Sequence, residues 1–402
     1  MKKRILHFIG VQAVRAAAIV ILFGLTVGAM MYLRGYFDFS FVERVPIGNA
    51  AKETLPVETE AVTEPPAEPD PVEGLLGTMT LEEKVGQLFL ARCPWDNAAE
   101  DVAEYHLGGY ILFDKDFEYR TAEEVLAEMN TYQEKAKIPL LIGVDEEGGT
   151  VVRVSCNYVL REERFQSPRN LFEEGGMERI IEDTAEKDAL LSSMGINVNF
   201  APVADIATEP GDFMYKRSFG QDARATADFT AQVVAQMAKD KMGSALKHFP
   251  GYGANVDTHT GIAVDERPLE TFLENDLLPF ASFAAGEGTT SIMVSHNIVT
   301  CMDETMPASL SAEVHRFLRE EMNFDGIIMT DALDMGAVQE YTDGGNIAVT
   351  ALRAGNDILL ICDYKTGIRA ILEAVEKGTV TEEMIDTACR RVLTWKQALG
   401  LI

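Results

Sequence analysis

Residues 326–331 read Gly-Ile-Ile-Met-Thr-Asp, a continuous apolar run that ends in an acid. Uninterrupted apolar residues are typical of a strand covered on both faces, as in a parallel sheet, whereas half-exposed strands alternate apolar and polar residues. Further short runs share this character: 87–91, 109–113, 140–145, 197–203, 245–249, 291–296 and 357–361. Together they predict a series of buried strands from about residue 75 to the C-terminus.

Amphipathic helical patterns separate these runs, for example over 121–135, 223–241 and 310–322. Repeated strand–helix units in one chain predict an α/β fold, a single TIM-type (β/α)8 barrel over residues 75–402. An open, doubly wound sheet is the alternative. No G-x-G-x-x-G motif follows the first run, which disfavours a dinucleotide-binding version of that sheet.

Polar residues stand at or near the ends of successive predicted strands. Asp145 ends the third run, Asp205 follows the fourth, Lys247 and His248 lie in the fifth, and His296 and Asp331 end the sixth and seventh. In a barrel the carboxyl ends of all strands meet at one face. We therefore expect these distant residues to surround one pocket.

The chain has 402 residues, with 64 acidic against 35 basic side chains and a formal net charge of −29. This excess of acid disfavours nucleic acid as a partner, because like charges repel. The five cysteines form no C-x-x-C pair, so neither a zinc ribbon nor a redox motif is indicated. Cys301 and Cys362 lie in or beside apolar stretches, and we expect both to be small buried residues.

The N-terminus carries a different pattern. Basic residues 2–4 precede an uncharged run over 16–33, long enough as a helix to cross a bilayer. It predicts a short cytoplasmic tail (1–11), a single-pass signal anchor (12–34) and an extracytoplasmic linker (35–74) rich in Pro and Glu. The barrel would then lie outside the cell membrane, tethered only by that helix. A cleaved signal peptide and a buried core helix are the alternatives.

Ordered motifs carry a family resemblance. They are Asp145-Glu146-Glu147-Gly148-Gly149-Thr150-Val151-Val152-Arg153, Asn199-Phe200-Ala201-Pro202-Val203-Ala204-Asp205, Arg217-Ser218-Phe219-Gly220, Lys247-His248-Phe249-Pro250-Gly251, Asp257-Thr258-His259 and Thr330-Asp331-Ala332-Leu333. From about residue 75 to its end the chain resembles glycoside hydrolase family 3, within it the bacterial β-N-acetylglucosaminidases, also called β-hexosaminidases.

The resemblance implies catalytic roles. Asp331 matches the nucleophile, a carboxylate that forms a covalent glycosyl-enzyme. His259 matches the acid/base and Asp257 the carboxylate that orients it, since imidazole titrates near neutral pH. Taken alone, Thr-Asp-Ala at 330–332 is more often a helix N-cap than a nucleophile. The alternative for His259 is a histidine in a solvated loop.

The resemblance also implies sugar-binding positions: Asp145, Arg153, Arg217, Lys247 and His248. Carboxylate acceptors beside cationic donors suit the paired hydroxyls of a pyranose. Lys247 and His248 are neighbours on a strand and alternate in direction, so they need not both face the pocket. The alternative for each cation is a surface salt bridge.

His248, Asp257, His259 and His296 could also suggest a zinc site, but no H-E-x-x-H motif and no cysteine ligand supports it. We therefore expect neither a metal nor another cofactor. The chain departs from the family pattern at Tyr252 (usually His), Thr150 (usually Arg) and Thr258 (often Ser). These changes leave the nucleophile and the dyad in place and put the preferred leaving group in doubt.

The expected activity is a retaining exo-hydrolysis of terminal β-linked N-acetylglucosamine, from peptidoglycan fragments or related glycans, by a monomer whose partner is carbohydrate. One alternative on the same fold is a β-glucosidase. Another is a phosphorylase, because a neutral imidazole acid/base does not repel an incoming phosphate as a carboxylate does. A membrane-tethered sugar-binding protein without activity is the alternative of another class.

Overall fold

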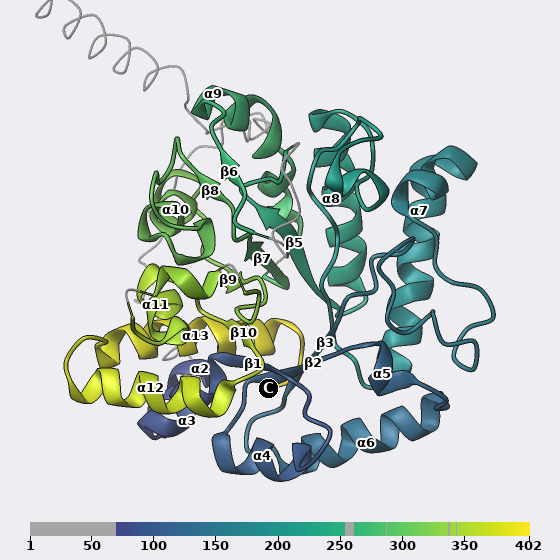
Figure 1. The fold of residues 1–402 in the computed structure, drawn as a ribbon. Coiled ribbons are helices and arrows are strands. Elements are labelled where there is room, and N and C mark those ends of the chain that lie inside the picture. The colour runs from purple at the N-terminus through teal and green to yellow at the C-terminus, as the bar shows by residue number, and fades with distance from the viewer. Residues whose placement is uncertain (1–69, 254–260, 287, 337, 343) are drawn as a thin grey trace, which may run out of the picture. The chain divides into compact units, whose positions relative to one another are not determined.

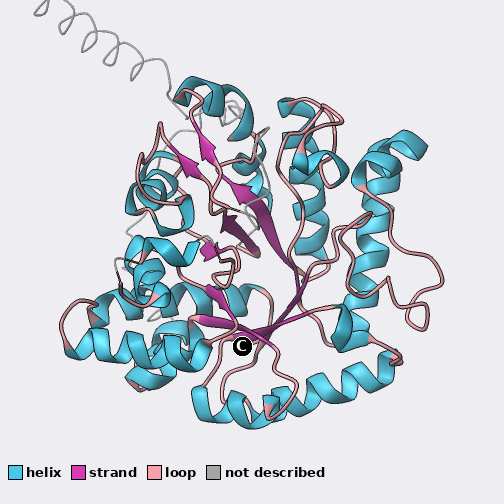
Figure 2. Cartoon of the chain, viewed as in Figure 1, coloured by secondary structure: helices cyan, strands magenta, loops and turns pink. Residues whose placement is uncertain are grey.

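The structure is a computed structural model, and it describes residues 70–253, 261–286, 288–336, 338–342 and 344–402. Parallel strands form one eight-stranded sheet, drawn as arrows in Figures 1 and 2, in the order β10-β1-β2-β3-β4-β5-β7-β9. Their bounds are β1 Phe89–Arg92, β2 Gly109–Leu112, β3 Leu141–Val144, β4 Val198–Asn199, β5 Gly243–Phe249, β7 Thr290–Val294, β9 Ile327–Thr330 and β10 Leu359–Ile361. Each of the predicted runs overlaps one of these strands.

The two outer strands of this order meet each other. A parallel bridge joins Met329 of β9 to Ile358, directly before β10, and the Thr330 amide donates to the Ile358 carbonyl at 3.2 Å. The Thr330 hydroxyl accepts the Leu360 amide at 3.1 Å. An open doubly wound sheet would leave two unpaired edges, so the nearly closed barrel excludes that alternative.

Helices follow the strands around the barrel (Figure 1). The α-helices are α2 Pro71–Leu76, α3 Leu81–Gln87, α4 Ala98–Tyr105, α5 Asp114–Phe117, α6 Ala122–Lys135, α7 Pro168–Ser193, α8 Ala223–Lys239, α9 Leu269–Thr271, α10 Ala312–Arg316, α11 Ile347–Ala354, α12 Tyr364–Glu376 and α13 Glu382–Ala398. Short 3-10 turns cover Phe213–Lys216, Pro279–Gly286, Ala308–Leu310 and Val338–Tyr341, and π turns cover Phe272–Asp276 and Phe317–Glu321. A separate two-stranded sheet pairs β6 Val264–Asp265 with β8 Ile298–Val299.

Local sequence explains where helices begin. Thr121 precedes α6. Its hydroxyl accepts the Glu124 amide, and its own amide donates to the Glu124 carboxylate, which together form a capping box. Asp70 caps α2, whose Val72 and Leu76 are buried, and α2 packs against α13. Residues 71–74, assigned above to the end of the linker, therefore form part of a helix on the barrel.

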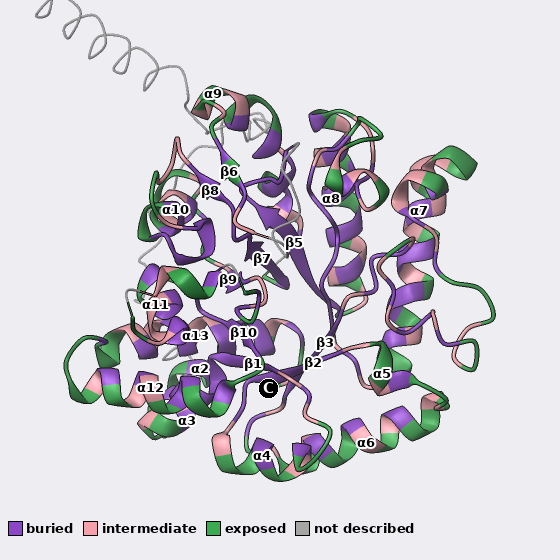
Figure 3. Ribbon diagram, viewed as in Figure 1, coloured by how far each residue is buried: buried purple, intermediate pink, exposed green. Residues whose placement is uncertain are grey.

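Figure 3 shows the strands of the eight-stranded sheet buried along almost their whole length. Only Arg92, at the end of β1, is partly exposed among the residues of the eight-stranded sheet that the structure describes. Strands buried on both faces account for apolar runs without alternation. The same burial leaves the strand ends as the place where polar side chains can gather.

Within the described residues, no helix has both the length and the apolar character needed to cross a bilayer. The segments predicted as tail, anchor and most of the linker (1–69) lie outside the described residues. The prediction that Cys301 and Cys362 are buried was wrong. Cys362 is exposed and Cys301 partly exposed, because both follow a strand rather than lie within one, whereas Cys93 and Cys389 are buried.

Candidate active site

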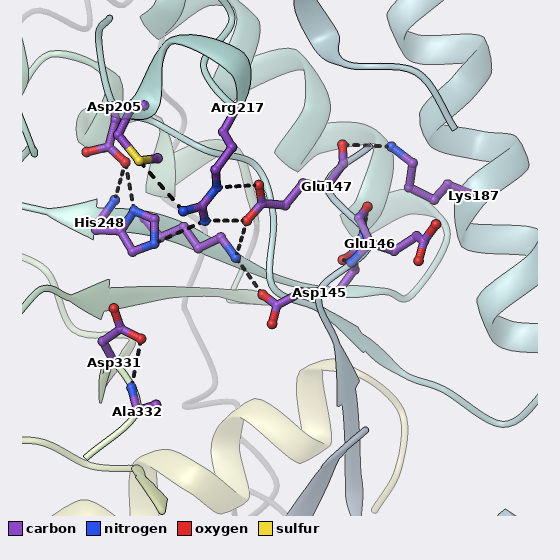
Figure 4. A network of polar contacts seen from close by, with 12 residues as sticks. Asp145, Glu146, Glu147, Lys187, Asp205, Arg217, His248, Asp331 and Ala332 are labelled. Carbon is purple, nitrogen blue, oxygen red and sulfur yellow. Dashed lines mark hydrogen bonds and ion pairs between the residues drawn. The ribbon is translucent and has the colours of Figure 1, made fainter. Parts of the chain in front are cut away.

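The strand ends bring several of the predicted site residues to one rim. Asp145 directly follows β3, Lys247 and His248 lie near the end of β5, and Asp331 directly follows β9. Arg217 comes from the segment between β4 and α8, just after the 3-10 turn at Phe213–Lys216. Figure 4 shows side chains from these elements turned toward one another.

Lys247 is the centre of an ion network. Its ammonium lies 2.6 Å from Asp145 Oδ1 and 2.7 Å from Glu147 Oε1. Burial lowers the pKa of Lys247, but the charges of Asp145 and Glu147 outweigh burial and raise it above its ordinary value. The lysine therefore stays charged and holds two acids of the β3 loop in fixed positions.

Glu147 receives a second cation. Arg217 donates to its carboxylate from Nε at 2.9 Å and from Nη2 at 2.7 Å (Figure 4). Burial would raise the pKa of Glu147, yet Arg217 and Lys247 together hold it well below its ordinary range. Glu147 was not among the residues predicted to form the site. Its position two residues after Asp145, at a strand end, was the available signal.

His248 joins the same network. Its Nδ1 lies 2.7 Å from Asp205 Oδ2, and its Nε2 lies 3.4 Å from Arg217 Nη2. A guanidinium can only donate, so in the neutral ring Nε2 accepts from Arg217, and in either protonation state Nδ1 carries the proton that Asp205 accepts. Asp205 also accepts the amides of His248 and Tyr252, at 3.1 and 2.7 Å. Asp205 thus fixes the ring orientation, a role that was not predicted from its place after the fourth run.

The structure brings both Lys247 and His248 to the network, although neighbours on a regular strand alternate in direction. Both side chains reach Arg217 or its partner Glu147, so both face the network. The pairing of β5 with β7 shifts register between Lys247 and Phe249, and regular alternation fails at that point.

Asp331 lies on the same rim, one strand beyond β7. Its Oδ1 accepts the amide of Ala332 at 2.7 Å, and its own amide donates to Val294. Residues 331–336 form turns rather than a helix, so the N-cap alternative does not hold. Burial would raise the pKa of Asp331, but the charges of His296 and His248, the Ala332 amide and Lys247 hold it below its ordinary value.

Arg153 lies apart from this network. Its guanidinium carbon is 5.7 Å from the centre of the Phe113 ring, and its backbone amide donates to Glu146 Oε2 at 2.7 Å. Glu146 is fully buried and also accepts the amides of Val154 and Ser155. Glu146 thereby ties the segment that carries Arg153 to the end of β3.

Asp257 and His259 lie outside the described residues. Before that gap, Tyr252 is buried and packs edge-on against His248, with ring centres 5.6 Å apart. This departure from the family pattern therefore supports the His248 ring. Thr150, the other departure, is exposed at the tip of a turn bridged by Gly148 and Val151.

Across the described part of the chain, no group of three or more His, Cys, Asp or Glu side chains is arranged to hold a metal ion. The cations Lys247 and Arg217 occupy the positions between the acids of the rim instead. What the arrangement offers chemically is an ionised carboxylate, Asp331, beside a rigid set of donors and acceptors suited to hydroxyl groups.

Comparisons with known proteins agree with this geometry. Residues 80–395 match the model of the glycosyl hydrolase family 3 N-terminal domain. Beta-hexosaminidase A of Pseudoalteromonas piscicida is 29% identical over 330 residues, which span 75% of this chain and 55% of that protein. Beta-hexosaminidase of Glaesserella parasuis is 28% identical over 309 residues, 74% of this chain and 87% of its own length.

Among solved structures, a family 3 beta-N-acetylglucosaminidase from a Paenibacillus species superposes with a TM-score of 0.74 and 32% identity, over 80% of this chain and 63% of that one. The family model covers the strands, the rim and the network described above. With fold, motifs and site in agreement, the chain belongs to glycosyl hydrolase family 3.

Proposed function

We propose that this chain is a retaining exo-β-N-acetylhexosaminidase that removes terminal β-linked N-acetylglucosamine. The observation that carries the proposal is Asp331, a carboxylate at a strand end whose pKa is held low by neighbouring imidazoles and Lys247. A nucleophile must be ionised before it attacks, and Asp331 meets that requirement. The names of the relatives, beta-hexosaminidase and beta-N-acetylglucosaminidase, support the choice of sugar.

In the first step, Asp331 attacks the anomeric carbon while the glycosidic C–O bond breaks. His259, as imidazolium, gives its proton to the departing oxygen. In the second step, neutral His259 takes a proton from water, whose oxygen displaces the Asp331 ester and releases the sugar. Asp257 orients the imidazole and favours its charged form.

The rim network would hold the sugar during both steps. Asp145 and Glu147 offer carboxylate acceptors, and Lys247, Arg217 and His248 surround them with donors. Charged hydrogen bonds to hydroxyls position the anomeric carbon without reorganisation, because the ion pairs exist before the substrate arrives. Arg153 would contact the sugar from the Phe113 side of the rim.

We further propose peptidoglycan fragments as the natural substrates, with the enzyme outside the cell on a membrane anchor over 12–34. The test uses the purified full chain with a chromogenic β-N-acetylglucosaminide and the matching β-glucoside, each with and without phosphate. We expect hydrolysis of the N-acetylglucosaminide, loss of activity in Asp331→Asn, and no acceleration by phosphate. Activity confined to the β-glucoside would overturn the specificity, and sugar phosphate as the product would overturn hydrolysis.

A further inference from the structure

Lys187 reaches the candidate active site from a helix outside the barrel. It lies in the last third of α7, and only 7% of its surface is exposed. Its ammonium donates to the backbone carbonyl of Glu147 at 3.3 Å (Figure 4). The side chain of the same glutamate forms the ion pairs with Arg217 and Lys247. Glu147 is thus held twice, by the rim through its carboxylate and by α7 through its main chain.

Two further contacts fix the Lys187 ammonium. The Asp183 carboxylate, one turn earlier on α7, lies 3.1 Å away, and the centre of the Phe165 ring lies 5.2 Å away. Asp183 and Phe165 are both buried. A buried ammonium needs a counter-charge and hydrogen-bond acceptors, because an unpaired buried ion is costly. Asp183 supplies the charge and the Glu147 carbonyl supplies an acceptor, so this lysine has a defined position.

The main chain that Lys187 holds is a tight turn. Gly148 and Gly149 follow Glu147 with φ angles of 98° and 66°, in the left-handed region that favours glycine. The amides of Glu147 and Gly148 donate to the Val151 carbonyl at 3.0 and 3.1 Å. These two bonds close the turn on itself and do not tie it to a helix. The bond from Lys187 makes that connection.

A small cavity lies on the α7 side of Glu147. It measures about 30 Å³ and lies between α7, α8 and the barrel, with Glu147, Arg217, Asp183 and Lys187 among the residues that line it. Protein interiors are otherwise close-packed, and neighbouring atoms hold each side chain in place. A cavity removes those contacts on one side. Packing from the α7 side therefore does not fix Glu147, and the bond to Lys187 takes that part.

We propose that Lys187 is a positioning residue that holds Glu147 where its carboxylate meets the sugar. The inference deepens the proposed hexosaminidase function and rests on it, since Glu147 offers its oxygens to the sugar hydroxyls there. Without Lys187 the turn at 147–149 should relax toward the cavity, and the carboxylate of Glu147 should move with it. Lys187 contacts the main chain of this turn from α7 and acts on the sugar only through Glu147.

The test removes the buried pair as a whole. Lys187→Met/Asp183→Leu replaces two buried charges by apolar side chains and leaves neither charge unpaired, so urea unfolding should give a midpoint close to that of wild type. Lys187→Gln is the second variant, should the double variant not fold. Its amide can pair with Asp183, but the side chain is one atom shorter than lysine and should not reach Glu147.

Steady-state kinetics on a chromogenic N-acetylglucosaminide separates positioning from stability. Glu147 binds the sugar in the ground state and in the transition state alike, so KM should rise about tenfold in either variant while kcat stays within about twofold. Lys187→Arg, which keeps a charged donor, should retain most of the wild-type affinity. Lys396→Met, which removes a fully buried lysine of α13, is the matched control and should leave KM unchanged.

An unchanged KM in the double variant, a loss confined to kcat, or an equal rise in Lys396→Met would overturn the positioning role. Hydrogen exchange gives a second readout that does not need the reaction. The amides of Glu147 and Gly148 should exchange at least about tenfold faster in the double variant and at the wild-type rate in Lys396→Met.

The two readouts also separate this inference from the proposed function. If wild type cleaves no N-acetylglucosaminide, the hexosaminidase proposal fails, and faster exchange at Glu147 and Gly148 still supports Lys187 as the residue that holds this turn. If wild type cleaves the substrate and the exchange of these amides is the same in the double variant, the enzyme proposal stands and the role of Lys187 is overturned.

Discussion

Arg217 and Glu147, seventy residues apart in the chain, are joined by two nearly parallel hydrogen bonds of 2.9 and 2.7 Å. The same guanidinium reaches His248 Nε2 at 3.4 Å, so one side chain links the β3 loop to β5. Lys247 closes the arrangement from the other side of Glu147. The rim is therefore preorganised before any sugar binds, and its rigidity is what the first prediction tests.

Arg217→Lys should lower kcat/KM on a chromogenic N-acetylglucosaminide by about ten- to a hundredfold. An ammonium cannot make both bonds to Glu147 and also reach His248, so the acceptors for the sugar lose their fixed positions. Arg224→Lys, on the exposed face of α8, is the control. An unchanged kcat/KM in Arg217→Lys would show that the fork is dispensable.

Asp205→Asn should destabilise the fold by about 1–3 kcal/mol and lower activity as well. Asp205 accepts the His248 ring and two amides, and an asparagine must place its NH2 group against one of these donors. Urea unfolding followed by circular dichroism gives the free energy. Asp228→Asn, exposed on α8, should match wild type. If both variants lose the same free energy of unfolding, Asp205 has no special role in stability.

Loss of His259 should depend on the leaving group. In His259→Ala, alkyl N-acetylglucosaminides should react about a hundred- to ten-thousandfold more slowly than with wild type. Dinitrophenyl N-acetylglucosaminide should be affected far less, because its oxygen leaves without a proton. Asp257→Asn should show the same trend more weakly. Equal losses for both leaving groups would contradict the acid/base assignment.

Lys396 should make the free energy of unfolding depend on pH. It is fully buried, and its Nζ donates to Gln87 Oε1 at 2.6 Å. Burial lowers its pKa to about 7, against only a small upward contribution from Cys389. Between pH 7 and the ordinary lysine pKa the unfolded chain binds a proton that the folded chain does not, so stability rises with pH there, by at most about 1.4 kcal/mol per unit.

The comparison of urea unfolding at pH 7 and pH 9 checks this expectation. Wild type should gain stability over that interval, and Lys396→Met should gain clearly less. Lys377→Met, an exposed lysine at the end of α12, should follow wild type. If wild type and Lys396→Met show the same slope, Lys396 does not titrate in this range.

The sequence predicted the strands well because burial on both faces leaves long apolar runs. It predicted their lengths less well. The run at 197–203 becomes strand only at Val198–Asn199, since Pro202 has no amide to donate to the ladder. The helix expected over 310–322 becomes a 3-10 turn, a short α10 and a π turn, a difference in hydrogen-bond spacing that hydrophobic periodicity does not report.

The candidate site was likewise predicted only in part. Asp145, Arg217, Lys247 and His248 were predicted and lie in one network, because strand ends converge in a barrel. The strand-end positions of Glu147 and Asp205 place both at the rim, but their partners Arg217, Lys247 and His248 are distant in sequence, so the local pattern does not identify their roles. The position of Arg153 over Phe113 likewise depends on Glu146 and its bonds to the loop backbone.

The central claim, a covalent intermediate on Asp331, is tested most directly by trapping. The full chain is incubated with a slow fluorinated N-acetylglucosaminyl donor, digested, and analysed by mass spectrometry. The proposal predicts one added sugar on the peptide that contains Asp331 and no label in Asp331→Asn. A sugar attached to another residue, or turnover of the donor with no labelled peptide, would contradict it.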